Sequence, residues 1–363
     1  MKRLLAKAWH DPIVWRLARI LFSLGIAAGF GYVFVQRADL DQVWESLGDL
    51  KVAILLGAVA FYFFNVWFQA MRWHFLIKHL GSPGSLKLVP PMLIGVMGNN
   101  ILPLRLGIVL RAEYLWSRFR INAPAAFSTV IIEGWLDGVV LALVFVPALA
   151  LIGTEQGIIR GILISGGIAA GALLLLRLAF TERVSAFWRK HAGGLPRLPT
   201  PRFLKSLLGP LVRSFLTGMV SIRSNYILAQ ALFWTTTAWL ARAVELYLVG
   251  LAFGLGQPFP DYLVLTAALS ASGIIQVSPG NTGPYEFVAA EIMTRLGAER
   301  GDAAAFAIIS HVVLYAPVTL VGGITFAWHR LTLRQFQERQ RIQEQAGNAG
   351  PPRTTAASPS ESR

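Results

Sequence analysis

The sequence predicts an all-α polytopic membrane protein, on the basis of its low charge and its long apolar blocks. Only 14% of the 363 residues are charged and 55% are hydrophobic, whereas a soluble domain carries roughly 25% charged residues. The apolar residues gather in blocks that suit a hydrocarbon layer of about 30 Å, which takes roughly 20 helical residues to cross. Together these observations favour a lipid-facing surface over a water-facing one.

Six apolar blocks have the length of a full membrane span. In the first block, five basic residues precede the apolar run from Ile20 to Val35 and no convincing cleavage site follows, so we interpret it as an uncleaved span rather than a signal peptide. The six predicted spans are residues 16–36, 50–71, 126–152, 157–180, 225–250 and 303–328.

Two further apolar blocks are interrupted by proline and glycine. Residues 86–117 are broken at 99–107, and residues 262–297 are broken at 278–284. Proline and glycine in such density stop a helix. We therefore expect eight apolar segments, of which six are full spans and two are hairpins of broken helices.

The charges between the blocks predict the topology, because Lys and Arg are retained on the cytoplasmic side. The acidic stretch 37–49 is expected outside, whereas Arg118 and Arg120 are expected inside. The block 86–117 then begins and ends on the cytoplasmic face, which makes it a re-entrant hairpin. This placement also accounts for the net charge of +14 without nucleic-acid binding.

The second half of the chain predicts the same arrangement with the opposite orientation. The linker 181–223 is basic and cytoplasmic, and so is the stretch after His329, so 262–297 begins and ends outside. Span, hairpin and span thus occur at about 50–152 and again, inverted, at about 225–328. Inverted repeats with broken helices are typical of transporters. Eight plain spans with proline kinks are the alternative, and they also leave both termini cytoplasmic.

Two domains follow from this organisation. Residues 1–334 form the polytopic domain, and residues 335–363 are polar and aperiodic, which predicts a disordered cytoplasmic tail.

Charged residues inside the apolar segments are candidates for function, because they are costly in a membrane. Arginine binds phosphate with two parallel hydrogen bonds, and the acids would meet a cationic part of a headgroup or carry a proton. Ion pairs within the bundle are the structural alternative. The candidate residues of a lipid-headgroup cavity are Asn100, Pro103, Arg105, Gly107, Arg111, Glu133, Asp137, Arg242, Glu245, Pro279, Gly280, Gly283 and Glu286.

Other features predict structural roles or exclude chemistry. Arg72 and Trp73 are interpreted as an interfacial anchor, and His311 as a packing residue in the last span. The sequence contains no cysteine and none of the common hydrolase, metalloprotease or nucleotide-binding motifs. We therefore expect no catalytic residue, metal or cofactor, and membrane lipids rather than nucleic acid as partners.

Three motifs carry a resemblance to a known family. They run from Asn100 through Pro103, Arg105 and Gly107 to Arg111, from Glu133 to Asp137, and from Pro279 through Gly280 and Gly283 to Glu286. Over about residues 15–330 the chain resembles the lysylphosphatidylglycerol synthase transmembrane (flippase-like) family. It departs from the family pattern at Ile108, Gly134 and Asn281, where an acid, an arginine and a glycine are usual.

The resemblance implies a stand-alone membrane domain, without the synthase domain, that translocates a lipid between the leaflets of a bacterial cytoplasmic membrane. The cargo would be an anionic phospholipid or a lipid-linked headgroup. A first alternative is an accessory or scaffold protein of lipid or envelope-glycan biosynthesis, including hopanoid biosynthesis, with a partner enzyme. A second is an intramembrane transferase.

Overall fold

The computed structural model describes five main stretches of the chain. They are residues 40–81, 83–102, 106–150, 224–273 and 278–329, with isolated helical positions at 25–36 and 167–174. Residues 1–325 make one compact unit and residues 326–363 another. The predicted spans 16–36 and 157–180 lie largely outside the described residues, and the linker 181–223 and the tail 335–363 lie wholly outside them.

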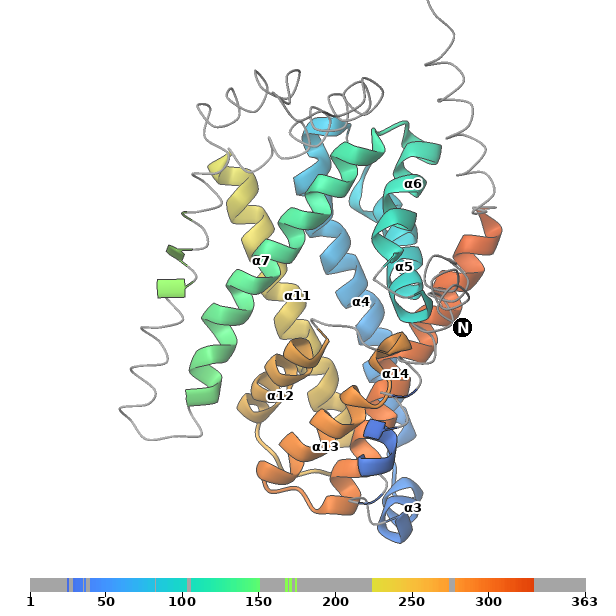
Figure 1. The fold of residues 1–363 in the computed structure, drawn as a ribbon, viewed down its shortest axis with the longest axis vertical. Coiled ribbons are helices and arrows are strands. Elements are labelled where there is room, and N and C mark those ends of the chain that lie inside the picture. Colours follow the sequence, from blue (N-terminus) through green and yellow to red (C-terminus); the bar gives the residue numbers. More distant parts are fainter. Residues whose placement is uncertain are drawn as a thin grey trace, which may run out of the picture. The chain divides into compact units, whose positions relative to one another are not determined.

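All regular elements of the described stretches are helices (Figure 1). The first half contains α3 (Leu40–Gly48), α4 (Val52–Ile77), η1 (Lys78–Leu80), α5 (Ser85–Ile101), α6 (Gly107–Phe119) and α7 (Ala123–Ala150). The second half contains α11 (Asn225–Ala252), α12 (Phe259–Ser272), η4 (Pro279–Asn281), α13 (Pro284–Arg295) and α14 (Arg300–Trp328).

Three described helices have the length and composition to cross a membrane. They are Val52–Leu80, Ala123–Leu143 and Arg300–Trp328, and each overlaps a span expected from the sequence. Helix α11 has 28 residues and coincides with the expected span 225–250. It packs lengthwise against α4 in the middle of the fold (Figure 1).

Two helical hairpins occupy the interrupted blocks. Helix α5 packs on α6, and α12 packs on α13. Their arms have 17, 13, 14 and 12 residues, so at about 1.5 Å per residue none reaches the roughly 30 Å of a hydrocarbon layer. The α5–α6 hairpin lies toward one end of the long helices and the α12–α13 hairpin toward the other (Figure 1).

Small residues set the close approach of α5 and α6. A Cβ atom on Gly98 would lie 2.7 Å from the Cα of Gly107, and one on Gly107 would lie 2.7 Å from the backbone nitrogen of Asn99. Contacts this short leave no space for a side chain, so the two backbones pack directly against each other, as is common between membrane helices. Gly107, a candidate site residue, thus has a packing role.

The breaks of the two hairpins meet each other. η4 packs against α5, and a Cβ atom on Gly280 would lie 3.6 Å from the carbonyl oxygen of Asn100. Gly280 has a φ of 63°, a conformation that glycine adopts without steric cost. The side chain of Asn100 donates a hydrogen bond of 2.8 Å to Thr319 on α14. Among the described residues of the second break, Gly280 and Asn281 are therefore buried inside the fold, as membrane depth requires of irregular backbone.

The acidic stretch before α4 forms a helix, α3, where the sequence suggests a loop. The Oγ of Ser46 donates to Asp302 at 2.6 Å, and Gln42 donates to Glu299 at 2.7 Å and accepts from the backbone N–H of Gly301 at 3.0 Å. These contacts satisfy groups at the start of α14, where the first backbone N–H groups of a helix lack internal partners.

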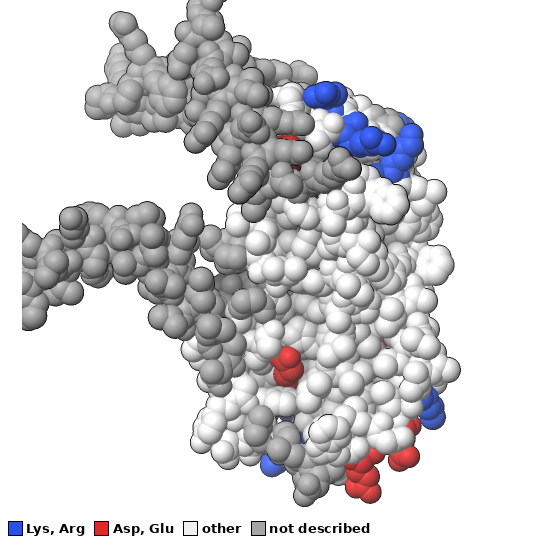
Figure 2. Space-filling view, turned by 90° about the vertical axis from the view of Figure 1, so that its right-hand side faces the viewer, with Lys and Arg blue, Asp and Glu red and all other residues white. Residues whose placement is uncertain are grey.

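Exposed charge differs between the two ends of the long helices. Lys78, Lys87, Arg118 and Arg120 are exposed where α4 and α6 end and α5 begins. Figure 2 shows Lys and Arg gathered at one end, Asp and Glu concentrated toward the other, and a wide, largely uncharged band between them. The band is consistent with a lipid-facing surface.

Candidate functional site

Arg111 and Glu133 form a buried, two-pronged ion pair between α6 and α7. The Nη1 and Nη2 atoms of Arg111 donate to the two carboxylate oxygens of Glu133 at 2.9 and 3.2 Å. The guanidinium carbon lies 4.0 Å from the centroid of the Trp73 ring, a cation–π geometry. Arg111 is therefore held by an acid and an aromatic face of the protein itself.

Arg72 extends this pair into a four-membered charge network. Its Nη1 lies 2.6 Å from Asp137 and its Nη2 lies 3.5 Å from Glu133. The indole N–H of Trp239 also donates to Asp137, at 3.0 Å. Two arginines and two acids balance in charge, and such a pairing offsets the cost of removing each from water.

The interpretation of Arg72 and Trp73 as an interfacial anchor is wrong. Arg72 is 4% exposed and Trp73 is 0% exposed, and the indole N–H of Trp73 donates to Thr129 at 2.9 Å. The acids on α7 and the aromatic packing hold both side chains inside the bundle.

A second cluster joins α4 to α11. Glu245 is fully buried and accepts a hydrogen bond of 2.8 Å from Asn65. The Nη1 of Arg242 reaches Glu245 at 3.3 Å, and its guanidinium lies 5.1 Å from the Tyr62 ring centroid. The side chain of Arg242 remains 29% exposed, unlike the buried arginines of the first network.

A third cluster lies at the break of the second hairpin. Gly283 precedes α13 with a φ of 92°, and its N–H donates to the carboxylate of Glu286 at 2.7 Å. This contact caps the start of α13. The other oxygen of Glu286 lies 2.5 Å from the Nδ1 of His311, whose Nε2 lies 3.1 Å from the carbonyl oxygen of Gly280. His311, expected to be a packing residue, thus binds both ends of the break.

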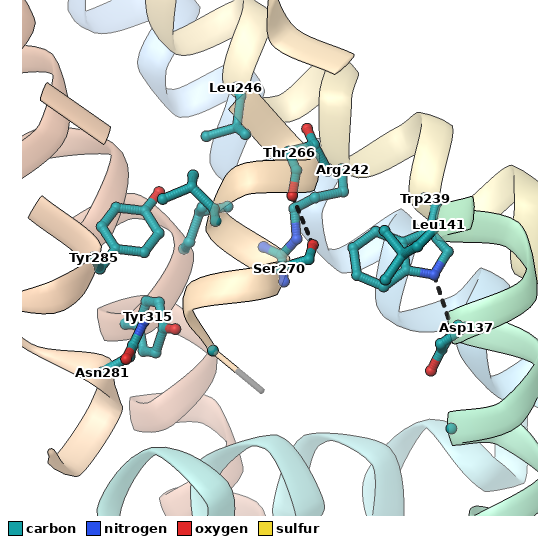
Figure 3. Close-up of a pocket in the computed structure, with 15 residues that line it drawn as sticks. Asp137, Leu141, Trp239, Arg242, Leu246, Thr266, Ser270, Asn281, Tyr285 and Tyr315 are labelled. Atoms are coloured by element: carbon teal, nitrogen blue, oxygen red, sulfur yellow. Dashed lines mark hydrogen bonds between the residues drawn. The ribbon is translucent and has the colours of Figure 1, made fainter. Parts of the chain in front are cut away.

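A cavity of about 470 Å³ has one member of each of the first two clusters in its wall, together with two residues next to the third (Figure 3). Helices α7, α11, α12, α13 and α14 and the break after α12 form its walls. Asp137 and Arg242 are its charged lining residues, and Figure 3 shows Arg242 pointing toward Ser270 while Trp239 reaches Asp137. Leucines and glycines form part of the wall, and its uncharged polar and aromatic residues are Trp239, Thr266, Ser270, Asn281, Tyr285 and Tyr315.

Asn281 carries an unusual polar atom into this wall. The residue is 3% exposed and has a φ of 62°. Its side-chain nitrogen donates to Ser272 at 3.2 Å, while its Oδ1 has no hydrogen-bond partner among the described residues. A buried acceptor without a partner is costly, so the described residues leave this part of the wall incompletely hydrogen-bonded.

The candidates chosen from the sequence separate into groups. Of these, Asp137 and Arg242 line the cavity. Arg111, Glu133 and Glu245 lie in ion pairs. Asn100 and Gly107 pack in the first hairpin, and Pro279, Gly280, Gly283 and Glu286 form the second break. Pro103 and Arg105 lie outside the described residues.

Sequence reasoning missed the uncharged part of the cavity wall. Trp239, Tyr285 and Tyr315 belong to apolar helices and carry no charge that would distinguish them from lipid-facing aromatics. Asn65 was also missed, because it is an uncharged residue of an apolar helix. A detectable signal was its spacing of four residues from Gln69, which places two amides on one face of the helix. These two side chains form a hydrogen bond of 3.3 Å.

The long apolar helices, the hairpins and the buried charges define a polytopic α-helical membrane protein with an internal polar cavity. The chain belongs to the lysylphosphatidylglycerol synthase transmembrane-region family, whose model matches residues 20–322.

Two relatives are similar along most of this chain. A UPF0104 membrane protein of Methanothermobacter thermautotrophicus is 24% identical over 317 residues, which cover 84% of this chain and 90% of that protein. The glycosyltransferase AglD of Haloferax volcanii is also 24% identical over 317 residues, which cover 79% of this chain but only 50% of AglD. This chain therefore matches about half of AglD. No solved structure matches the chain.

Proposed function

We propose that this protein moves a phospholipid or a lipid-linked headgroup between membrane leaflets. The headgroup would occupy the cavity between α7, α11 and the second hairpin while the acyl chains stay in lipid. The proposal rests chiefly on one observation: the partly exposed side chain of Arg242 lines a cavity of about 470 Å³ inside a membrane fold.

Arg242 is suited to hold a phosphate. It reaches Glu245 through Nη1 at 3.3 Å, whereas Arg111 holds Glu133 through both terminal nitrogens. Arginine offers five N–H donors in a planar fork that matches a phosphate. Because Arg242 contacts Glu245 through one nitrogen, its guanidinium has more N–H donors left for a ligand than the guanidinium of Arg111 has.

The remaining wall suits the rest of a headgroup. Asp137 offers a carboxylate to an amine or hydroxyl, and Ser270 and Tyr315, which carry hydroxyls, line the same wall. A site with one cation, one anion and several hydroxyls matches a zwitterionic or polyhydroxylated phosphate ester better than a densely anionic one.

The arrangement of the hairpins supports an inverted repeat, as alternating access requires. In each half the second hairpin arm pairs with the following long helix: Arg111 with Glu133 in the first and Glu286 with His311 in the second. The sequence also places Pro-x-x-x-Gly at both breaks, from Pro103 to Gly107 and from Pro279 to Gly283.

Charge favours one orientation in a bacterial inner membrane. The end that carries Lys78, Lys87, Arg118 and Arg120 would face the cytoplasm, because basic residues are retained there. The first hairpin would then enter from the cytoplasm and the second from the opposite side, with both termini cytoplasmic.

A liposome assay tests the proposed function. Purified protein would be reconstituted with fluorescent phosphatidylglycerol or phosphatidylethanolamine, and an impermeant quencher would report the fraction of lipid in the outer leaflet. Losing a charge-assisted hydrogen bond costs about 1.5–3 kcal/mol, so Arg242→Gln should slow lipid movement roughly tenfold or more.

The matched control is Arg295→Gln. Arg295 forms an exposed ion pair with Glu291 on α13 and does not line the cavity, so its loss should leave the rate unchanged. Equal rates for wild type and Arg242→Gln would exclude this site, and a rate equal to that of protein-free liposomes would exclude lipid movement.

The name of AglD favours an intramembrane transferase as the second candidate. This chain matches only half of that protein, so the catalytic part of AglD can lie in the other half. Incubation of the purified protein with membrane lipids and a sugar-nucleotide donor distinguishes the two functions, because a transferase would produce a new lipid in the extract.

A further inference from the structure

His311 and Glu286 are in contact at the break of the second hairpin. His311 lies on α14 and Glu286 in the first turn of α13, and both side chains are largely buried. The Nδ1 of His311 lies 2.5 Å from the Oε1 of Glu286, and its Nε2 lies 3.1 Å from the carbonyl oxygen of Gly280. One imidazole ring therefore joins the helix and the break on either side of it.

The number of protons in this contact follows from the atoms. A carbonyl oxygen only accepts hydrogen bonds, so Nε2 must carry a hydrogen to bind Gly280. The short contact between Nδ1 and the carboxylate oxygen needs a second hydrogen between the two atoms. A neutral imidazole beside an ionised carboxylate has one hydrogen too few, so the geometry requires one additional, exchangeable proton.

We propose that Glu286 and His311 form a proton-binding site whose occupancy latches the second hairpin to α14. Without the proton, the ring has one N–H for two acceptors, so either the lone pair of Nδ1 faces the carboxylate or the lone pair of Nε2 faces the carbonyl of Gly280. Glu286 remains anchored by the N–H of Gly283. In either tautomer one of the two contacts of the imidazole opens, and the ring no longer joins α14 to both sides of the break.

Among the described residues, the groups around His311 are two tyrosine rings, a serine, the backbone of α5 and one arginine of the cavity wall. The ring of Tyr285 on α13 lies 4.4 Å from His311, and that of Tyr315 on α14 lies 4.2 Å from it, between ring centroids. Tyr285 donates its hydroxyl hydrogen to Ser310 at 3.2 Å. From α5, the backbone of Asn100 approaches Gly280. Arg242 of α11 lines the cavity together with Tyr285 and Tyr315, and is the basic residue of that wall.

The latch borders the cavity wall. Asn281 and Tyr285 line the cavity, and they lie on either side of Gly283, within the segment that His311 holds at Gly280 and Glu286. Opening of the latch would therefore release part of the wall. This consequence rests on the proposed function, since it would let a proton gradient control access of a headgroup to the cavity.

Spin-label distances test the latch without any transport measurement. The sequence contains no cysteine, so the variant Thr282→Cys/Leu320→Cys carries labels only at the second break and on an exposed site of α14, where Leu320 is 66% exposed. The labelled protein would be reconstituted in phosphatidylglycerol and phosphatidylethanolamine liposomes. Distances would be measured from about pH 5 to about pH 9, which spans the ordinary titration of histidine.

In the labelled protein that keeps Glu286 and His311, the distance between the two spin labels should be short and narrowly distributed at acidic pH. At alkaline pH it should be longer or more broadly distributed. Glu286→Gln should abolish this pH response, because the amide oxygen can still accept from Gly283 while the amide N–H donates to Nδ1, so that a neutral imidazole keeps both contacts. His311→Gln should abolish it too, and serves if the first variant fails to fold. Glu291→Gln, the same change on the same helix, should retain the response.

Two results would overturn the proposal: a distance that does not change with pH in the unmodified pair, or an unchanged response in both Glu286→Gln and His311→Gln. Arg242→Gln separates this inference from the proposed function. This variant should keep the pH-dependent distance between the labels while it loses lipid movement. If the protein with an intact Arg242 shows the pH-dependent distance but moves no lipid, only the proposed function is refuted.

Discussion

Arg111 holds Glu133 through both of its terminal nitrogens, at 2.9 and 3.2 Å, and the pair is buried between α6 and α7. The first hairpin is thereby tied to the long helix that follows it. This pair lies behind the cavity rather than in its wall, so its substitution should affect the stability of the protein before it affects any ligand.

Replacing Arg111 by Ala should be strongly destabilising. Removing one partner of a buried ion pair leaves the other uncompensated and costs about 3–5 kcal/mol. Thermal unfolding in detergent, followed by size-exclusion chromatography, would measure the loss. Arg118→Ala, which removes an exposed arginine of the same helix, should leave the unfolding temperature unchanged.

The double substitution Arg111→Met with Glu133→Gln should recover much of that stability, because it removes both charges together. If the single and the double variants unfold at the same temperature, the ion pair is not the source of the effect.

Gly107→Ala should loosen the first hairpin. The added Cβ would lie 2.7 Å from the backbone nitrogen of Asn99, and overpacking of this kind costs about 1–3 kcal/mol. The unfolding temperature should fall accordingly. Gly138→Ala is the matched control, because a Cβ there meets no atom within 4 Å and alanine favours a helix by about 1 kcal/mol over glycine. An equal fall in both variants would contradict the close approach of α5 and α6.

Asp137→Asn should change which headgroup the cavity accepts. The substitution removes the anion from a wall that also contains Arg242, and a unit charge at this range contributes about 1 kcal/mol or more. The rate ratio of phosphatidylglycerol to phosphatidylethanolamine in the liposome assay should therefore rise roughly fivefold or more. Asp49→Asn, at an exposed position, should leave the ratio as it is, and an unchanged ratio for Asp137→Asn would argue against headgroup binding beside it.

Ser270→Leu should block the cavity without unfolding the protein. Ser270 lines the cavity, and its hydroxyl donates to the backbone of its own helix, at the carbonyl of Thr266 and a distance of 2.6 Å. A larger apolar side chain would fill space that a headgroup needs, so lipid movement should fall while the unfolding temperature holds. Ala271→Leu places the same side chain at the next, exposed position, and its rate should match the wild type. Normal movement in Ser270→Leu would mean that the headgroup takes another route.

Part of the charge network could be predicted from spacing. Glu133 and Asp137 are four residues apart on one helix, so they were expected on one face, and both contact Arg72. Arg72 itself was placed at the interface because it ends an apolar block. The sequence does not reveal that two acids located 61 and 65 residues further along the chain pack beside Arg72 in the fold.

The sequence by itself determined the helical class of this protein, the positions of the four long helices among the described residues, and the places where two further apolar blocks are interrupted. These features depend on local chemistry: the length of apolar blocks, and the inability of proline and glycine to continue a helix. The tertiary structure decided which charges neutralise one another, which arginine faces the cavity and which aromatics form its wall. Those properties arise when helices far apart in sequence pack together, as when Asn65 bonds to Glu245 across 180 residues, and no local pattern records them.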